Sequence, residues 1–144
     1  MSITYKDTTR YVPPITGGIV VKVYDGDTIT IASKLPYDES PLYRFSVRIY
    51  GLDCAEMRTS NEREKSFAEF VQETLSKKIM GKYITLTDVD LDKYGRVLAN
   101  VHINDENITQ FLIEQRMAVP YYGGKKETPD DWWDYYDYYN FKQT

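Results

Sequence analysis

Apolar and polar positions alternate in short runs through the first third of the chain. Two runs that are rich in β-branched residues, Ile19–Tyr24 and Thr28–Ile31, are separated by Asp25-Gly26. Branched side chains favour extended backbone, and an Asp-Gly pair between two such runs is typical of a tight turn. The pattern therefore predicts a β-hairpin.

A strict period of two follows a loop-like stretch at 33–41. Its apolar members are Phe45, Val47 and Ile49, and Arg48 lies between the last two. Because neighbouring side chains of a strand point to opposite faces, this pattern predicts a third strand. We expect that strand to direct Arg48 away from the core, into solvent or a cleft.

The apolar period changes to that of a helix after residue 60. A stripe at helical spacing predicts a helix over Glu62–Lys78, with Thr59 and Glu62 spaced as a capping box at its start. The stripe consists of Phe67, Phe70, Val71 and Leu75.

Two more strands and two more helices complete the pattern. Residues 82–87 and 97–103 predict strands on either side of a turn at Asp92–Gly95. Apolar spacing over 108–116 predicts a second helix that ends near Arg116. Thr128–Asp131 predicts the start of a third helix, with proline at the first helical position.

The order of these elements predicts the fold class. Three strands, a helix, two strands and then helices lack the alternation that a parallel sheet requires. We expect an α+β protein, mainly a β-barrel: a five-stranded OB-fold Greek-key barrel capped by about three helices. Residues 1–16 are expected to form an N-terminal arm, and 17–144 one domain with an aromatic, acidic C-terminal helix.

Composition narrows the class of function. The formal net charge of -4 argues against an unaided, sequence-indifferent nucleic-acid coat protein, because phosphate binding depends on lysine and arginine. The chain contains one cysteine and no membrane-length apolar run. We expect a soluble monomer without membrane contact, intracellular as written, or secreted if a signal has been removed.

Charged side chains gather in three stretches, Asp25–Thr28, Arg48–Glu56 and Asp92–Arg96. Taken alone, each stretch is explained by residues that favour a turn or by a charged loop in solvent. Together they contain what phosphodiester hydrolysis needs: carboxylates for a hard cation, guanidinium groups for phosphate oxygens and a base for water.

These stretches resemble the staphylococcal nuclease (thermonuclease) family. The resemblance is carried by Val23–Thr28, Val47–Glu56 and Asp92–Arg96, in the family's order and spacing, within roughly residues 17–122. It implies an OB-fold nuclease that cuts single-stranded or unpaired DNA or RNA, with little sequence specificity. The products implied carry a 5′ hydroxyl and a 3′ phosphate.

The resemblance also implies a role for individual residues. Asp27 and Asp53 match carboxylate ligands of one calcium ion, and the backbone carbonyl of Cys54 matches a further ligand. Glu56 matches the group that orients or deprotonates the attacking water. The arginines that would clamp the scissile phosphate are Arg48 and Arg96.

Further positions match substrate-binding residues of the family. Lys93 and Tyr94 match contacts to a terminal phosphate, and Tyr121 or Tyr122 falls where a tyrosine packs on a base. For both tyrosines, ordinary packing is an equal alternative. A catalytically weak nucleic-acid or protein binding module of the same fold is the alternative for the whole chain.

Two features depart from the family pattern. Cys54-Ala55 replaces a pair that often contains proline, which leaves the carbonyl ligand in place but removes a constraint on the Glu56 loop. Cys54 itself is interpreted as a small buried filler rather than a redox group. The second departure is the aromatic, acidic tail Asp130–Tyr139, which is expected to pack on the barrel, with a partner-binding surface as the alternative. His102 is expected to serve a structural role.

Overall fold

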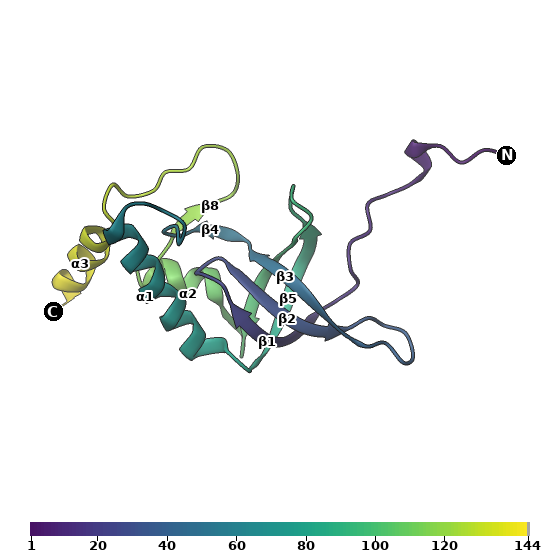
Figure 1. Ribbon diagram of the computed structural model, residues 1–144, viewed down its shortest axis with the longest axis horizontal. Coiled ribbons are helices and arrows are strands. Elements are labelled where there is room, and N and C mark those ends of the chain that lie inside the picture. The colour runs from purple at the N-terminus through teal and green to yellow at the C-terminus, as the bar shows by residue number, and fades with distance from the viewer. Residues whose placement is uncertain (144) are drawn as a thin grey trace.

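Five long strands form a closed barrel (Figure 1). The structure is a computed structural model that describes residues 1–143, with side chains up to residue 138. The barrel strands are β1 (Gly17–Val23), β2 (Thr28–Lys34), β3 (Leu42–Ile49), β5 (Tyr83–Leu91) and β6 (Val97–Ile103). They are hydrogen-bonded in the order β3-β2-β1-β5-β6, and β3 also pairs with β6. The predicted five-stranded α+β barrel is confirmed.

The barrel closes through a parallel pair of strands. Val47 of β3 lies beside Val97 of β6, whereas every other pair in the barrel is antiparallel. The strand order along the chain predicted antiparallel neighbours and gave no sign of this closure. The reason is that the two strands are connected through two other strands and a helix, not through a single crossover.

Short strands and three helices surround the barrel. The remaining elements are η1 (Tyr5–Asp7), β4 (Gly51–Asp53), α1 (Glu62–Ile79), β7 (Glu106–Asn107), α2 (Ile108–Glu114), β8 (Val119–Tyr121) and α3 (Trp132–Gln143). Strands β4 and β8 form a separate antiparallel pair beside the barrel. The apolar pattern could not predict β4, β7 and β8, because strands of two or three residues contain too few positions to show a period.

Helix α1 begins with a different cap from the predicted one. The side chain of Asn61 accepts a hydrogen bond from the backbone N–H of Glu64 at 3.1 Å, so Asn61 is the N-cap. The predicted capping box of Thr59 and Glu62 is wrong. Thr59 instead accepts a hydrogen bond from the Asn61 N–H at 3.1 Å, in the turn that precedes the helix.

The core lies between the barrel interior and the apolar face of α1. Phe67, Val71 and Leu75 of α1 are fully buried, as the helical stripe predicted, whereas Phe70 is only partly buried. Barrel strands contribute Ile29, Ile31, Val47, Ile49, Ile84 and Val101. Burial of this many branched side chains supplies the main stabilisation of the fold.

Helix α3 begins at Trp132, so the predicted start with Pro129 at the first helical position is wrong. The side chain of Asp131 accepts a hydrogen bond from the Asp134 N–H at 2.9 Å and caps the helix. Trp132 is 4% exposed and stacks on Phe67 of α1, with ring centroids 5.6 Å apart. The tail therefore packs, as expected, but against α1 more than against the barrel (Figure 1).

Residues before β1 extend away from the barrel (Figure 1). Most of their side chains are exposed. The segment is attached near its end, where Ile15 is buried and the Thr16 carbonyl accepts a hydrogen bond from the Leu86 N–H at 2.8 Å, and by Arg10, whose Nη2 donates to the Asp92 carbonyl at 3.4 Å. In the part of the chain that the structure describes, no helix combines the length and hydropathy needed to cross a bilayer.

Candidate functional site

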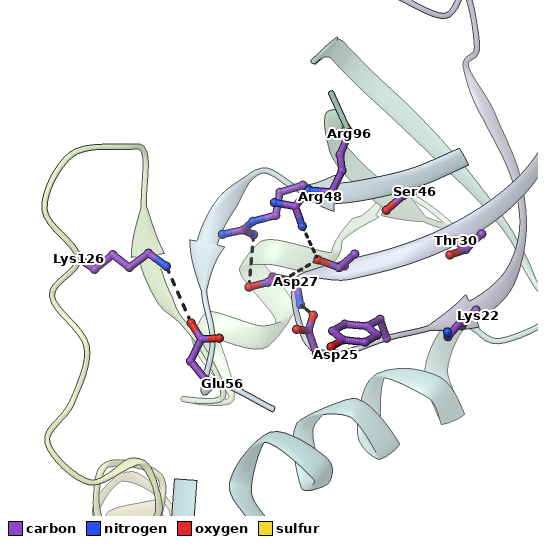
Figure 2. A pocket seen from close by; sticks show the side chains of 11 residues that line it. Lys22, Asp25, Asp27, Thr30, Ser46, Arg48, Glu56, Arg96 and Lys126 are labelled. Carbon is purple, nitrogen blue, oxygen red and sulfur yellow. Dashed lines mark hydrogen bonds and ion pairs between the residues drawn. The ribbon is translucent and has the colours of Figure 1, made fainter. Parts of the chain in front are cut away.

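Four of the predicted site residues line one cavity of about 480 Å³ on the barrel surface. They are Asp27, Arg48, Glu56 and Arg96, and Figure 2 shows their side chains around the same opening. The fifth, Asp53, is 3% exposed and lies behind Arg48. The geometry therefore brings the five residues together, while their individual chemical roles remain predictions.

The β1–β2 turn fixes Asp27 at the cavity. Asp25 accepts a hydrogen bond from the Asp27 N–H at 3.0 Å, as expected for turn chemistry, and the Thr28 hydroxyl donates to Asp27 Oδ1 at 2.8 Å. A Cβ atom on Gly26 would lie 2.6 Å from the Cys54 sulfur. Glycine is required there because the turn approaches the end of β4 so closely, and this contact places Asp27 near Asp53.

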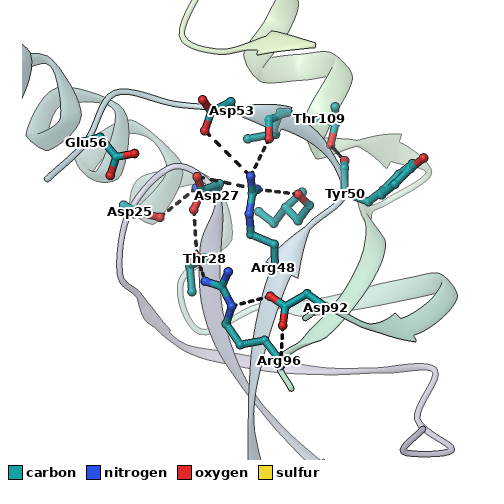
Figure 3. Close-up of polar contacts among 12 residues, drawn as sticks. Asp25, Asp27, Thr28, Arg48, Tyr50, Asp53, Glu56, Asp92, Arg96 and Thr109 are labelled. Carbon is teal, nitrogen blue, oxygen red and sulfur yellow. Dashed lines mark hydrogen bonds and ion pairs between the residues drawn. The ribbon is translucent and has the colours of Figure 1, made fainter. Parts of the chain in front are cut away.

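Arg48 is held rigidly between two strands, with its side chain only 13% exposed. Its Nη1 and Nη2 atoms donate hydrogen bonds to the carbonyls of Ile49 and Leu52, each at 2.9 Å. The same nitrogens lie 3.7 Å from Asp27 Oδ2 and 4.0 Å from Asp53 Oδ1 (Figure 3). The expectation that Arg48 points from the core into a cleft is confirmed.

Arg96 is positioned by the turn before β6. Asp92 Oδ2 accepts a hydrogen bond from Arg96 Nε at 2.7 Å, and Arg96 Nη1 donates to the Thr28 hydroxyl at 3.3 Å. Partial burial opposes ionisation of Asp92, yet hydrogen bonds from Arg96 and Tyr94 hold its pKa below the usual value. Gly95 has a φ of 84°, which permits this tight turn.

Glu56 stands at the rim of the cavity, with its side chain 60% exposed. Its backbone N–H donates a hydrogen bond to Glu64 Oε2 of α1 at 2.8 Å, which anchors the loop that carries it. Partial burial raises the pKa of Glu56, and the nearby Lys126 opposes that shift.

Lys126 enters the site from the loop between β8 and α3. Its Nζ lies 3.5 Å from Asp53 Oδ1 and 4.0 Å from Glu56 Oε1. Figure 2 shows it reaching across to Glu56. The sequence gave no sign of this contact, because Lys126 belongs to no recognised motif and the Gly123-Gly124 pair before it indicates only a loop.

Carboxyl groups and cations are interleaved at the site. The carboxyl groups of Asp25, Asp27, Asp53 and Glu56 lie near Arg48 and Lys126, and Arg96 and Lys22 line the same cavity. Burial, and then the proximity of Asp27, raises the pKa of Asp25 to about 7. Carboxylate oxygens, which Asp27 and Asp53 offer here, are ligands that calcium prefers.

The side chains alone do not complete a metal centre. Among the described residues, no group of three or more His, Cys, Asp and Glu side chains is arranged to hold a metal ion. A calcium ion at Asp27 and Asp53 would therefore need backbone carbonyl or water oxygens as further ligands.

A second cavity, of about 280 Å³, adjoins the first. Lys93, Tyr94 and Tyr122 line it, and Arg48, Arg96 and Lys126 line both cavities. The Tyr122 ring is 69% exposed and lies 5.5 Å from the Tyr50 ring. The predicted substrate-binding residues thus lie next to the predicted catalytic ones, and Tyr121 lines the same cavity.

Cys54 and His102 have structural surroundings. Cys54 is 4% exposed, and burial raises the pKa of its thiol well above the usual value, which disfavours the reactive thiolate. This supports its interpretation as a buried filler. His102 Nε2 lies 3.1 Å from the Thr87 hydroxyl, a hydrogen bond between neighbouring strands that agrees with a structural role.

Comparisons with known proteins agree with this geometry. The chain is 28% identical to Protein ParB of Escherichia coli over 123 residues, which cover 78% of this chain and 62% of ParB. It is 29% identical to an uncharacterized endonuclease of Escherichia coli over 105 residues, 72% of this chain and 60% of the relative. An uncharacterized endonuclease of Haemophilus influenzae is 31% identical over 102 residues, 71% of this chain and 51% of the relative.

The chain covers between about half and two thirds of the length of these relatives. The sequence model of the staphylococcal nuclease homologue family matches residues 46–138, which include Arg48, Asp53, Glu56 and Arg96. The Asp27 hairpin lies before the matched segment. With most of its length matched, the chain belongs to the staphylococcal nuclease homologue family.

Proposed function

We propose that this chain is a nuclease that hydrolyses phosphodiester bonds in single-stranded or unpaired DNA or RNA, with one calcium ion. The observation that carries the proposal is the single cavity lined by Asp27, Arg48, Glu56 and Arg96. It brings two carboxylate groups and two guanidinium groups to a place where one phosphate could meet all of them. The family membership and the two relatives named endonucleases add support.

Calcium would be held by Asp27, Asp53 and the backbone carbonyl of Cys54. When bound, it supplies charge neutralisation at the phosphate and polarises the phosphorus–oxygen bonds. Asp53 is suited to this role because it offers carboxylate oxygens and is nearly buried, so its charge requires compensation by neighbouring cations or by a metal ion. Asp27 is suited because its hydrogen bond from Thr28 leaves its other oxygen, Oδ2, on the Arg48 side of the cavity.

Arg48 and Arg96 bind the oxygens of the scissile phosphate. Arg48 is pre-organised by its two carbonyl acceptors, and Arg96 by Asp92, so neither side chain must be ordered when the substrate arrives. Their planar donor groups stabilise the charge that develops on the phosphate oxygens during the reaction.

Glu56 orients the attacking water and accepts one of its protons. The water oxygen forms a bond to phosphorus, the bond from phosphorus to the 5′ oxygen breaks, and that oxygen takes up a proton. The products carry a 3′ phosphate and a 5′ hydroxyl. Glu56 can reach a water in the cavity because its exposed carboxylate stands at the rim.

A cleavage assay tests this function. Single-stranded DNA and RNA are incubated with the protein in calcium, and in parallel with a chelator, with Asp27→Asn as the matched variant. We expect calcium-dependent cutting that Asp27→Asn abolishes, and 3′ ends that a polymerase extends only after phosphatase treatment. Tight binding of either nucleic acid without turnover would favour a binding module of the same fold instead.

A further inference from the structure

A row of polar side chains crosses three strands beside the candidate site. In the strand register Lys22 of β1 pairs with Thr30 of β2, and Thr30 pairs with Ser46 of β3. All three line the larger cavity. Figure 2 shows them on the far side of Arg48 from Lys126, along the open face of the barrel.

A β-bulge keeps Lys22 on this face. The β1–β2 register shifts between Val20 and Lys22, and Val21 and Lys22 are both exposed although they are adjacent. Strict alternation from the buried Val20 would have turned Lys22 toward the core. Bulges re-aim side chains in this way, and here the bulge brings an ammonium group to the cavity.

The row lies two residues along the strands from Arg48, which is proposed to bind the scissile phosphate. Thr28 pairs with Arg48, and these residues are two positions along from Thr30 and Ser46 on the same strands. Side chains two residues apart share a face and are separated by about 6.8 Å. A nucleic-acid strand that is bound at Arg48 and follows the cavity therefore passes over the row.

The chemistry of the row fits a sugar–phosphate backbone. It offers an ammonium group and two hydroxyls, which donate hydrogen bonds to phosphate and sugar oxygens. Tyr24 lies beside it, with its ring centroid 5.8 Å from Lys22 Nζ and its side chain 40% exposed. An exposed aromatic ring of this kind provides a stacking surface for a base.

We propose that the row of Lys22, Thr30 and Ser46 binds the nucleotide next to the scissile phosphate, on the side opposite the Tyr122 cavity. This inference rests on the proposed nuclease function. Of these two cavities, Lys22 lines the larger and Tyr122 the smaller, while Arg48 lines both. The substrate strand thus occupies both cavities, and the bond that is cut lies inside the strand.

The test measures binding to an eight-nucleotide oligothymidylate by fluorescence anisotropy, in calcium, over a range of salt concentrations. The protein carries Glu56→Gln so that the strand stays intact. Adding Lys22→Met is expected to reduce the slope of log affinity against log salt by about 0.7, and to weaken binding about fivefold at 0.1 M salt. Lys82→Met, at another exposed lysine, controls for the change in net charge.

Lys22→Arg keeps the charge and should retain the binding of the Glu56→Gln parent. Equal affinities and slopes for Lys22→Met and Lys82→Met would overturn the proposed subsite. That result would leave the nuclease function standing, provided that the wild-type chain cuts the oligonucleotide in calcium. Absence of both cutting and binding by the wild-type chain would instead remove the function on which the subsite rests.

Discussion

Arg48 has a structural task and, under the proposed function, a chemical one in the same side chain. Its hydrogen bond to the Leu52 carbonyl ties β3 to β4, and Asp27 and Asp53 flank the same guanidinium. A nearly buried cation of this kind is stable only with such partners. The alternation of residues 45–49 predicted its direction, but the carbonyl acceptors depend on how β4 folds back, which no local pattern encodes.

Glu56 is expected to affect rate far more than stability. Glu56→Gln should lower kcat on the order of 10²-fold or more, because the amide cannot accept a proton from water. Its side chain is largely exposed, so Tm should change by no more than about 2 °C. Steady-state kinetics and thermal unfolding measure the two effects, with Glu127→Gln as the control. Loss of stability in parallel with rate would assign Glu56 a structural role instead.

We expect Lys126 to compete with a bound cation for Asp53, because its Nζ lies 3.5 Å from Asp53 Oδ1. Lys126→Met should tighten calcium binding about fivefold, since one unit charge at this distance contributes about 1 kcal/mol in water. Isothermal titration calorimetry measures the affinity directly. The control is Lys125→Met, an exposed neighbour in the same loop. If the two variants bind calcium equally, the Lys126 contact has no part in cation binding.

At the scale of elements, the contact between α1 and α3 depends on a surface ion pair as well as on aromatic packing. Arg63 of α1 donates hydrogen bonds to both carboxylate oxygens of Asp131, at 2.8 and 3.0 Å. Phe70 of α1 and Trp133 of α3 also pack together, with ring centroids 5.2 Å apart. Periodicity predicted both helices, but a helix pattern does not say which partner receives its apolar face.

The Arg63–Asp131 pair makes this contact sensitive to acid. Hydrogen bonds from Arg63, and then from Asp134, lower the pKa of Asp131 from 3.8 to about 2. Because the folded-state pKa is depressed, the stabilising contribution of Asp131 is present above about pH 4 and is lost as pH falls toward 2. The two tryptophans of the chain, Trp132 and Trp133, both lie in α3 and report its packing by fluorescence.

We therefore expect the tryptophan emission of the wild-type chain to shift to longer wavelength between pH 4 and 2. Asp131→Asn should show part of this shift already at pH 7, and a smaller change on acidification. Asp130→Asn, an exposed neighbour, serves as the control. Identical pH profiles for the two variants would mean that the Arg63–Asp131 pair does not hold α3.

Local signals predicted the helices better than their ends. Asn61 caps α1 in place of the predicted Thr59, and Asp131 caps α3 although Pro129 favoured an earlier start. Several residues near each helix start could cap it, and the choice depends on tertiary contacts such as the one between Glu64 and the Glu56 backbone. A propensity pattern therefore gives a helix but not its first residue.

At the scale of the whole molecule, the cavities and the aromatic tail are separate units. Among the residues whose side chains the structure describes, up to 138, none that lines either site cavity lies beyond Lys126. Removing residues 129–144 should therefore leave calcium-dependent cleavage in place well below the melting temperature. It should lower Tm by about 10 °C, because Trp132 and Trp133 no longer cover Phe67.

Thermal unfolding and cleavage of single-stranded DNA measure these two outcomes on the truncated chain. Trp133→Ala is the milder variant and should give a smaller fall in Tm with unchanged cleavage. Loss of cleavage in a truncated chain that remains folded would contradict this separation, and would place part of the catalytic apparatus in the tail.

The barrel and the clustering of charged motifs could be predicted from the sequence, because both follow from strand alternation and from turn residues that recur at strand ends. The parallel β3–β6 closure and the approach of Lys126 could not. Both depend on how segments far apart in the chain pack together. The composition gave the net charge of the chain. Which charged side chains lie together became clear only with the fold.

The central claim is that Asp27 and Asp53 share one calcium ion beside Arg48. A crystal structure of the Glu56→Gln protein with calcium and a short single-stranded oligonucleotide tests it most directly. We predict one calcium ion with carboxylate oxygens of both aspartates at about 2.3–2.6 Å, and a phosphate within reach of Arg48 and Arg96. A structure in which the nucleic acid occupies the cavity while neither aspartate contacts a metal ion would contradict the account.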